Sequence, residues 1–491
     1  MKRISVVLLL ILANQVMGQV FDTVSYYKKY TPKQLHHDLD FLLKKFEDVH
    51  PNYFSETPQD TVFKRYEQLK TRITNSMTRI DFMNLFAPVA FGVIKDGHNF
   101  VNLPPEDLKA YINKGGKFFP LPVTIRGGKL FVNSIHAKIP YQAEILTING
   151  KPVTEIVQAI LSTYNPEDRD YEERFLSNYF NVNYWQVFGG ADYFHLTYSE
   201  SLSKFVKRID LQPKSELDIM KLRSQSFGGK LSYVFEYPNY AYYEMPGLET
   251  GVIEYKACDD LENFRPFCDS VFTRLQNKHY KNLIIDIRSN LGGTTRLNGI
   301  LMEYLTDKPI TQYAEIDTKV SKDGKKDFIS ANRKYAHWFK WFHYLYYPIY
   351  IRTNRTRREA LTAKNGTFIR QMFLPEKPIE SMLRFKGNIY LLTSKATYSS
   401  AAIFAAAFKC YHLGTVIGQE TGEPTCFTGD WVAITLPNTK LQLGISNKRF
   451  ILACGKCDGH GVVPDILIDD KHLATRGGGL NYHTIELVLK K

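Results

Sequence analysis

The chain has 491 residues, of which 44% are hydrophobic, 14% aromatic and 23% charged. This balance excludes a collagen, a coiled coil and a largely disordered chain, and at roughly 150 residues per domain the length predicts a multidomain globular protein. The formal net charge is +13, but residues 319–370 alone contain thirteen basic and three acidic side chains. The rest of the chain is close to neutral, so the charge gives no reason to expect nucleic-acid binding.

Residues 1–18 have the layout of a secretory signal peptide. Lys2 and Arg3 supply positive charge, an apolar block follows at 6–13, and small residues precede Gln19. This order is typical of a segment that is cleaved during export. We therefore expect an exported protein, periplasmic or secreted; a short buried N-terminal helix is the alternative.

The six cysteines of an exported chain can form disulfides, and the sequence leaves their pairing open. They are Cys258, Cys268, Cys410, Cys426, Cys454 and Cys457. A zinc site built from the last two and a nearby histidine is the alternative, but a second ligand pair at the usual spacing is missing. We expect structural disulfides or buried thiols, with no metal and no cofactor.

Residues 19–115 are predicted to form a small helical domain. Apolar residues recur at helical spacing from Leu35 to Phe46 and from Val62 to Ile73, and each run predicts an amphipathic helix. A third helix is expected from about residue 81 to 93, with Thr78 as a possible N-cap.

The apolar spacing changes from helical to strand-like at about residue 116. The stretch FFPLPVTI, a Gly-Gly pair and KLFVNSI predict a hairpin, and EILTINGKPV adds a strand and a tight turn before a helix that begins near Thr154. These signals predict a small β-rich module over 116–165. Residues 166–227 show no clear pattern and are treated as a connecting region.

Strands and helices alternate from residue 228 to the C-terminus at 491. The predicted strands are 251–255, 283–287, 388–393 and 415–418, the predicted helices are 259–277 and 400–409, and a hairpin is predicted at 435–445. Apolar strands followed by amphipathic helices indicate a sheet with helical cover. A basic, aromatic insertion at about 319–385 interrupts this pattern.

Ser399 and Ser400 lie between a predicted buried strand and an alanine-rich helix. A serine at such a junction sits on a sharp turn, and the free N–H groups at the helix N-terminus can stabilise an oxyanion. Either serine could instead act only as the N-cap of the helix.

The strand at 283–287 runs into Gly292 and Gly293. A Gly-Gly turn at the carboxyl end of a buried strand exposes backbone amides where α/β proteins place their sites. Taken alone the turn could also be a phosphate loop, although it matches neither the Walker nor the dinucleotide pattern.

Two histidines lie on predicted loops. His98 follows Gly97 directly after the third helix, and His460 follows Asp458 in a turn that leads to an edge strand. A lone histidine is commonly a structural residue, so neither is a site by itself.

Four segments together resemble the tricorn-type and C-terminal-processing serine peptidases, in particular secreted bacterial members with an N-terminal helical domain. The segments are KDGH, LIIDIRSNLGG, TYSSAAIFAAAFK and GHGVVPDI. The resemblance covers roughly residues 35–470, without most of 166–227 and 319–385. It implies a multidomain α/β fold in which a ClpP/crotonase-like catalytic domain follows the helical domain and a PDZ-like module at 116–165.

The resemblance also implies roles for individual residues. Ser399 matches the nucleophile, and the amides of Ser400 and of the Gly292–Gly293 pair match the oxyanion hole. One branch of the family has a lysine base 25 residues after the nucleophile, but that position is Pro424. The tricorn branch uses a histidine on a Gly-His loop, which His98 matches.

The acidic partner of the histidine corresponds best to Asp458, although the family more often has the longer glutamate there. The expected activity is that of an exported serine endopeptidase acting on polypeptides. The alternatives are a non-catalytic peptide-binding protein on the same scaffold and a hydrolase of another acyl substrate.

The insertion is expected to form a mobile lid, or a surface that meets acidic peptides or anionic lipid through residues 319–370. A plain amphipathic hairpin is the alternative.

Overall fold

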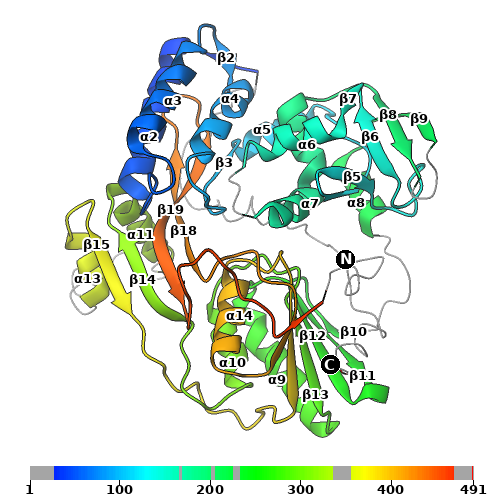
Figure 1. Cartoon of the computed structure of the whole chain (residues 1–491), viewed down its shortest axis with the longest axis vertical. Helices are drawn as coiled ribbons and strands as arrows, with labels where there is room; N and C mark the ends of the chain where they lie inside the picture. The colour runs from blue at the N-terminus through cyan, green and yellow to red at the C-terminus, as the bar shows by residue number, and fades with distance from the viewer. Residues whose placement is uncertain are drawn as a thin grey trace.

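The computed structural model describes residues 27–164, 168–200, 205–224, 233–335, 355–468 and 489. Three groups of elements follow one another along the chain, and Figure 1 shows the first two side by side above the third. The predicted signal peptide lies outside the described residues. None of the described helices is long and apolar enough to cross a membrane.

The first group consists of three helices, α2 (Pro32–Val49), α3 (Gln59–Thr71) and α4 (Arg79–Phe91), with a short ladder between β1 (Lys29–Tyr30) and β2 (Met77–Thr78). Their apolar stripes are fully buried, as predicted. Thr31 and Thr78 each cap a helix through a reciprocal capping box, which satisfies amide groups that the first turn cannot pair. The prediction of Thr78 as an N-cap is confirmed.

The second group contains a six-stranded sheet with the order β4-β5-β6-β8-β9, to which β7 is added beside β6. Its strands are β4 (Val123–Arg126), β5 (Lys129–Val132), β6 (Glu144–Ile148), β7 (Lys151–Pro152), β8 (Phe194–Ser199) and β9 (Val206–Leu211). Its helices are α6 (Val153–Leu161), α7 (Arg169–Phe188) and α8 (Glu216–Ser224), and α5 (Pro105–Asn113) precedes the sheet.

The predicted boundary of the β module at residue 165 is too early. Strand β8 pairs antiparallel with β6, and β9 pairs with β8, so a large part of the predicted connecting region belongs to the same sheet. The 20-residue helix α7 packs into the same apolar core. Its sequence has no clear apolar stripe because its buried face includes glutamate, serine and asparagine side chains, which explains why the pattern was missed.

The third group is built on a seven-stranded sheet with the order β10-β11-β12-β13-β16-β17-β20. The strands are β10 (Tyr233–Glu236), β11 (Tyr240–Met245), β12 (Thr250–Tyr255), β13 (Asn282–Asp286), β16 (Asn388–Thr393), β17 (Thr415–Gly418) and β20 (Ile466–Leu467). From β12 onward the strands are parallel. Helices α9 (Leu261–Asn277), α10 (Arg296–Glu303) and α14 (Ser400–Cys410) share one core with this sheet.

For most of the predicted strands and helices of this group, the observed first and last residues differ from the predicted ones by no more than two. The prediction of a multidomain α/β protein is confirmed. Crossover connections through helices place the carboxyl ends of β13 and β16 next to each other, which is where open parallel sheets usually carry their sites.

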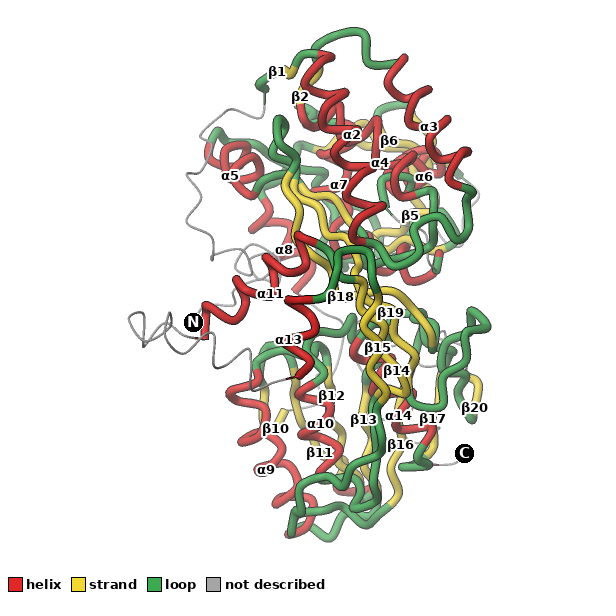
Figure 2. The backbone as a smooth tube through the Cα atoms, turned by 90° about the vertical axis from the view of Figure 1, so that its left-hand side faces the viewer, coloured by secondary structure: helices red, strands yellow, loops and turns green. Residues whose placement is uncertain are grey.

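A second, smaller sheet joins the groups. It has the order β15-β14-β19-β18, with β3 (Phe100–Asn102) paired to β19. The other strands are β14 (Tyr313–Lys319), β15 (Phe368–Met372), β18 (Cys426–Thr435) and β19 (Gln442–Leu452), and α11 (Lys322–Tyr335) and α13 (Arg355–Thr362) lie beside it. Figure 2 shows β18 and β19 running from the upper elements into the lower ones.

The β18–β19 hairpin contributes to two cores. Near its turn, Val432 and Leu443 are buried with the N-terminal helices, whereas Phe427 and Phe450 are buried with the large sheet. The turn itself is held by the buried Asp38 of α2, which accepts hydrogen bonds from the Thr439 backbone and hydroxyl at 2.8 and 2.7 Å. The hairpin was predicted, but its role as a connection between the two groups was not.

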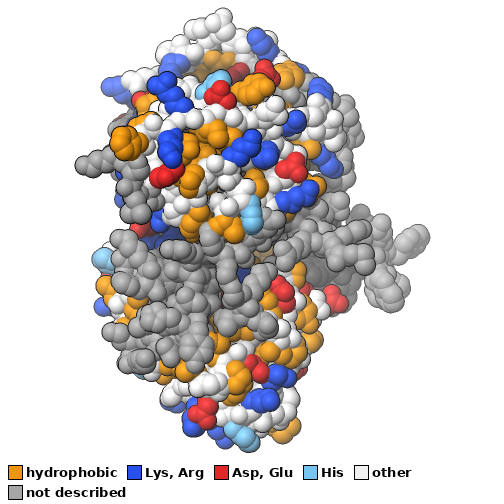
Figure 3. Space-filling view, turned by 90° about the vertical axis from the view of Figure 1, so that its right-hand side faces the viewer, with side chains coloured by type: hydrophobic (Ala, Val, Ile, Leu, Met, Phe, Trp, Pro, Cys, Tyr) orange, Lys and Arg blue, Asp and Glu red, His pale blue; other side chains and the backbone are white. Residues whose placement is uncertain are grey.

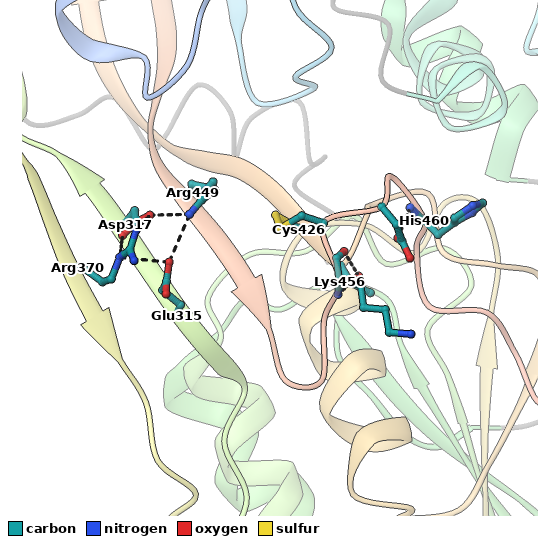
Figure 4. Close-up of a disulfide and its surroundings, with 10 residues drawn as sticks. Glu315, Asp317, Arg370, Cys426, Arg449, Lys456 and His460 are labelled. Carbon is teal, nitrogen blue, oxygen red and sulfur yellow. Dashed lines mark hydrogen bonds and ion pairs between the residues drawn. A yellow bond between two sulfur atoms is a disulfide. The ribbon is translucent and has the colours of Figure 1, made fainter. Parts of the chain in front are cut away.

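An ion-pair network lies across the small sheet. The buried Asp317 of β14 accepts hydrogen bonds from Arg370 at 2.9 Å and from Arg449 at 2.8 Å, and Figure 4 shows these side chains pointing toward one another. Burial raises the pKa of Asp317, but the two guanidinium groups outweigh it and lower the pKa below its usual value. The network ties β14, β15 and β19 together.

The described part of the insertion contains the helices α11 and α13 and the strand β15. Strand β15 pairs with β14 over five residues, so its backbone continues the small sheet. The aromatic cluster from Trp338 to Tyr347 lies outside the described residues. On the face shown in Figure 3, the basic and acidic side chains of the described residues are interspersed rather than gathered by sign.

Four of the six cysteines are paired. Disulfides join Cys410 to Cys454 and Cys426 to Cys457, while Cys258 and Cys268 are buried thiols. Because Cys454 and Cys457 are both in disulfides, the alternative zinc site is not formed. Among the described residues, no group of histidine, cysteine and acidic side chains could hold a metal ion.

Alkylation under denaturing conditions will test this pairing. Without reductant, iodoacetamide is expected to label two thiols, at Cys258 and Cys268, because the other four sulfur atoms are in disulfides. After reduction it is expected to label all six. Mass spectrometry of the intact chain and of its peptides gives both the number and the positions, and labelling of Cys454 or Cys457 without reductant would contradict the structure.

Candidate active site

Ser399 lies at the turn between β16 and α14. Its backbone angles are φ +49° and ψ −123°, and its side chain makes no capping hydrogen bond. A positive φ is rare for a residue with a side chain and costs on the order of 1–3 kcal/mol. The turn is held by the buried Thr397, whose hydroxyl donates to the Ile287 carbonyl and accepts from the Ser394 amide, both at 3.0 Å. The serine hydroxyl is therefore not used as a helix cap.

His98 lies on the loop between α4 and β3. The His98 amide donates to Oδ1 of Asp96 at 2.8 Å. The second carboxylate oxygen of Asp96 contacts Nε2 of His50 at 2.8 Å and accepts from the Thr428 hydroxyl at 2.5 Å. Asp96 and His50 are fully buried, so the loop is fixed by a polar cluster that joins the end of α2 to β18.

The structure brings His98 and Ser399 together across 301 residues of sequence. Nε2 of His98 lies 3.2 Å from Oγ of Ser399, a distance compatible with proton transfer from the hydroxyl to the ring. The imidazole is stacked between Tyr398 and Phe427, with ring centroids 5.2 and 5.5 Å away. Tyr398 stacks in turn on Tyr171 of α7 at 4.1 Å. All three groups of elements therefore contribute to the position of this ring.

The surroundings of His98 favour its neutral form. Burial lowers the pKa of the imidazole, while the charges of Asp96 and Asp430 and the Thr428 backbone raise it, and burial is the stronger effect. Nδ1 makes no hydrogen bond to any described residue. A neutral imidazole with Nε2 facing a hydroxyl can act as a general base.

The Gly292–Gly293 turn packs against the serine turn. A Cβ atom at position 292 would lie 2.7 Å from Cβ of Ser399 and 2.9 Å from the Ser400 nitrogen, and at position 293 it would lie 2.3 Å from the Cys258 carbonyl oxygen. Both glycines have positive φ, at 101° and 136°. Only glycine therefore allows this close approach.

The amides at this junction differ in their partners. The Gly292 amide donates to Oδ1 of the buried Asn290 at 2.9 Å, whereas the hydrogen bonds of the described residues use neither the Gly293 amide nor the Ser400 amide. The Ser400 hydroxyl donates to the Gly293 carbonyl at 2.5 Å and fixes the two turns together. Of the predicted oxyanion donors, Ser400 and Gly293 are thus available for a substrate.

The structure does not bring Asp458 to His98. Asp458 is exposed and accepts a hydrogen bond from the His460 amide at 3.1 Å, and no contact between the described residues joins it to the imidazole. His460 is also exposed and lies 3.3 Å from Glu420. After Cys457, which is joined by a disulfide to Cys426 at the start of β18, the loop is held by Glu420, which accepts a hydrogen bond from the Gly461 amide at 2.8 Å.

Two other buried carboxylates flank the imidazole. Oδ1 of Asp96 lies 3.9 Å from Nδ1, and Oε2 of Glu423 lies 3.7 Å from Nε2. Sequence reasoning missed both. The available signal for Glu423 was its place directly before Pro424, the position at which one branch of the resembled family has its base. For Asp96, the available signal was its position two residues before His98.

Residues 249–468 match the model of Peptidase family S41. This segment is similar to the serine-type peptidases of that family. The matched segment contains Ser399 and the Gly292–Gly293 turn, whereas His98 lies before it. The predicted resemblance and the predicted enzyme class are thus confirmed, and polypeptides are the substrates that the family implies. No curated protein sequence matches the chain significantly.

Several solved structures are similar to this chain. A CPAF variant is 12% identical, with 94% of this chain and 97% of that chain covered and a TM-score of 0.62. Mature CPAF is 13% identical, with 94% and 96% covered and a TM-score of 0.58. The photosystem II D1 C-terminal processing protease is 13% identical, with 90% and 94% covered and a TM-score of 0.44. At these identities, the two CPAF structures show a common fold over nearly the whole chain.

Substitution of Gly292 will test the packing of the two turns. Gly292→Ala is expected to displace the serine turn, because the added methyl group meets Cβ of Ser399 and backbone atoms of Ser400 and Tyr398, which cannot move independently. We expect the rate of Ser399 labelling by a fluorophosphonate to fall about 100-fold or more, as when oxyanion-hole geometry is lost. Gly299→Ala on α10 is the control, since its Cβ would approach other atoms only to 3.9 Å. Equal labelling of both variants would contradict the geometry.

Proposed function

We propose that this protein is an exported serine endopeptidase in which Ser399 is the nucleophile and His98 is the general base. The observation that carries the proposal is the 3.2 Å approach of His98 Nε2 to the Ser399 hydroxyl, beside two backbone amides that the described residues leave available. The buried Asp96 supports the base by holding its loop. The family supplies the reaction class, and this geometry supports the assignment of roles.

The geometry supports a two-step acyl transfer. The Ser399 oxygen attacks the peptide carbonyl while its proton moves to Nε2 of His98, and the amides of Ser400 and Gly293 stabilise the oxyanion. The imidazolium then gives the proton to the leaving amine, and an acyl-enzyme remains. Water, deprotonated by the same imidazole, attacks the ester and restores the serine hydroxyl.

Export and peptide binding by the β module are parts of the same proposal. Two disulfides favour an oxidising compartment, in agreement with the signal-peptide pattern. The module is proposed to be PDZ-like and to bind an extended segment of the substrate by strand addition. Its exposed β9 lies at the edge of its sheet, where such a strand could be added.

Removal of either reacting group is expected to abolish nearly all hydrolysis. Ser399→Ala and His98→Ala should each lower kcat/KM by about 10⁴ to 10⁶, with little further loss in the double variant, because the two groups act in one step. The measurement uses an unstructured polypeptide with a fluorescent cleavage readout. His460→Ala is the matched control and should retain wild-type turnover. Wild-type turnover of His98→Ala would contradict the proposed base.

The pH profile of the wild-type protein will report the environment of the base. Burial lowers the pKa of His98, so the neutral, reactive form should persist to lower pH than for an ordinary histidine. We expect kcat/KM to fall only below about pH 6.5 and to remain constant above it to neutral pH. A midpoint above pH 7 would show that the imidazole is not the buried base described here.

A further inference from the structure

A buried glutamate lies beside the two proposed reacting groups. Glu423 is in the loop between β17 and β18 and is fully buried. Its Oε2 accepts a hydrogen bond from the Ser399 amide at 3.0 Å, and the same oxygen lies 3.7 Å from Nε2 of His98. One carboxylate oxygen therefore faces both the backbone of the serine and the ring nitrogen that receives its proton.

The loop that carries Glu423 is fixed against the serine turn. The Gly422 amide donates to the Thr397 carbonyl at 3.2 Å, and a Cβ at position 422 would lie 2.1 Å from the Lys395 carbonyl oxygen. The Thr421 hydroxyl donates to the backbone carbonyl of Glu423 at 3.0 Å. These contacts leave the glutamate side chain little freedom to turn away from the site.

We propose that Glu423, and not Asp458, is the acidic positioning residue of this site, which holds the Ser399 backbone in its reactive conformation and stabilises the imidazolium of His98. The inference rests on the proposed function in so far as Ser399 and His98 are the reacting pair. It adds a residue that the resemblance does not assign.

The arrangement differs physically from an acid on the Nδ1 side of a histidine. A carboxylate at Nδ1 selects the tautomer whose Nε2 can accept a proton, and its loss leaves the wrong tautomer. Glu423 lies on the Nε2 side, so it cannot select that tautomer. Instead it stabilises the positive charge that appears after the proton has moved, and its loss should cost less than the loss of a tautomer-selecting acid.

The contribution of Glu423 can be separated from those of the other charges near the ring. Asp96 lies on the loop of His98 and contacts His50 of α2, Asp430 lies on β18, and Glu423 lies on the loop before β18. Asp458 is exposed and makes no contact with the ring. A substitution of Glu423 leaves all of these groups in place, so any change in the titration of His98 reports the removed charge.

The main variant is Glu423→Gln, which has the same shape and retains an oxygen that can accept the Ser399 amide. Removing the negative charge makes the imidazolium less stable, so the pKa of His98 should fall by about one unit. We expect kcat/KM to fall about 10- to 100-fold, mainly through kcat, and the acidic limb of the profile to move to lower pH. Asp458→Asn is the matched control and should change neither quantity.

The pKa of His98 is measured by NMR on histidine-labelled protein, with its resonance identified by its loss in His98→Ala. This titration does not depend on turnover. If the wild-type protein neither reacts with a fluorophosphonate nor cleaves peptides, the proposed function fails, while the titration still decides whether Glu423 is the charge partner. Glu423→Asp provides a second variant, which keeps the charge and should retain most of the wild-type pKa if Glu423→Gln does not fold.

Three results would overturn the inference. The first is an unchanged pKa of His98 in a folded Glu423→Gln protein. The second is a larger loss of kcat/KM in Asp458→Asn than in Glu423→Gln. The third is a lower unfolding temperature of Glu423→Gln with unchanged kcat and an unchanged pH profile, which would make Glu423 a purely structural residue.

Discussion

The arrangement of the molecule depends on the packing of one hairpin into two cores. The turn of β18–β19 is buried with the N-terminal helices and held by Asp38, while its other end is buried with the large sheet. Because Thr428 of β18 binds Asp96, the same hairpin also fixes the loop of His98. The position of the imidazole relative to the serine is thus set by long-range packing and by no local element.

The two reacting groups are held by opposite physical means. The serine turn is positioned by backbone contacts so close that only glycine fits opposite it, and its positive φ is maintained by the surrounding hydrogen bonds. The imidazole is positioned by stacking between two aromatic rings and by a buried carboxylate on its loop. Rigid backbone packing fixes the nucleophile, and planar side-chain contacts fix the base with its Nε2 facing the serine hydroxyl.

Burial of the site has two opposed electrostatic consequences. It lowers the pKa of His98, which keeps the base neutral, and it makes the imidazolium formed during the reaction unstable. Carboxylates at Asp96 and Glu423 on either side of the ring offset the second effect. The aromatic stack connects the β module to this ring indirectly, because Tyr171 of α7 stacks on Tyr398 and Tyr398 stacks on the imidazole.

The sequence by itself predicted most of the helices, the parallel strands and the hairpin at 435–445, because periodicity and turn chemistry are local properties of the chain. The residues Ser399, His98, Gly292 and Gly293 came from the resemblance of its motifs to a peptidase family. The sequence could not extend the module beyond residue 165, since the pairing of β8 with β6 joins segments about fifty residues apart whose intervening helix lacks an apolar stripe. It also placed the acid at Asp458. Only the tertiary structure decided which carboxylates reach the imidazole, because that depends on the direction in which two loops leave their strands and not on the order of residues.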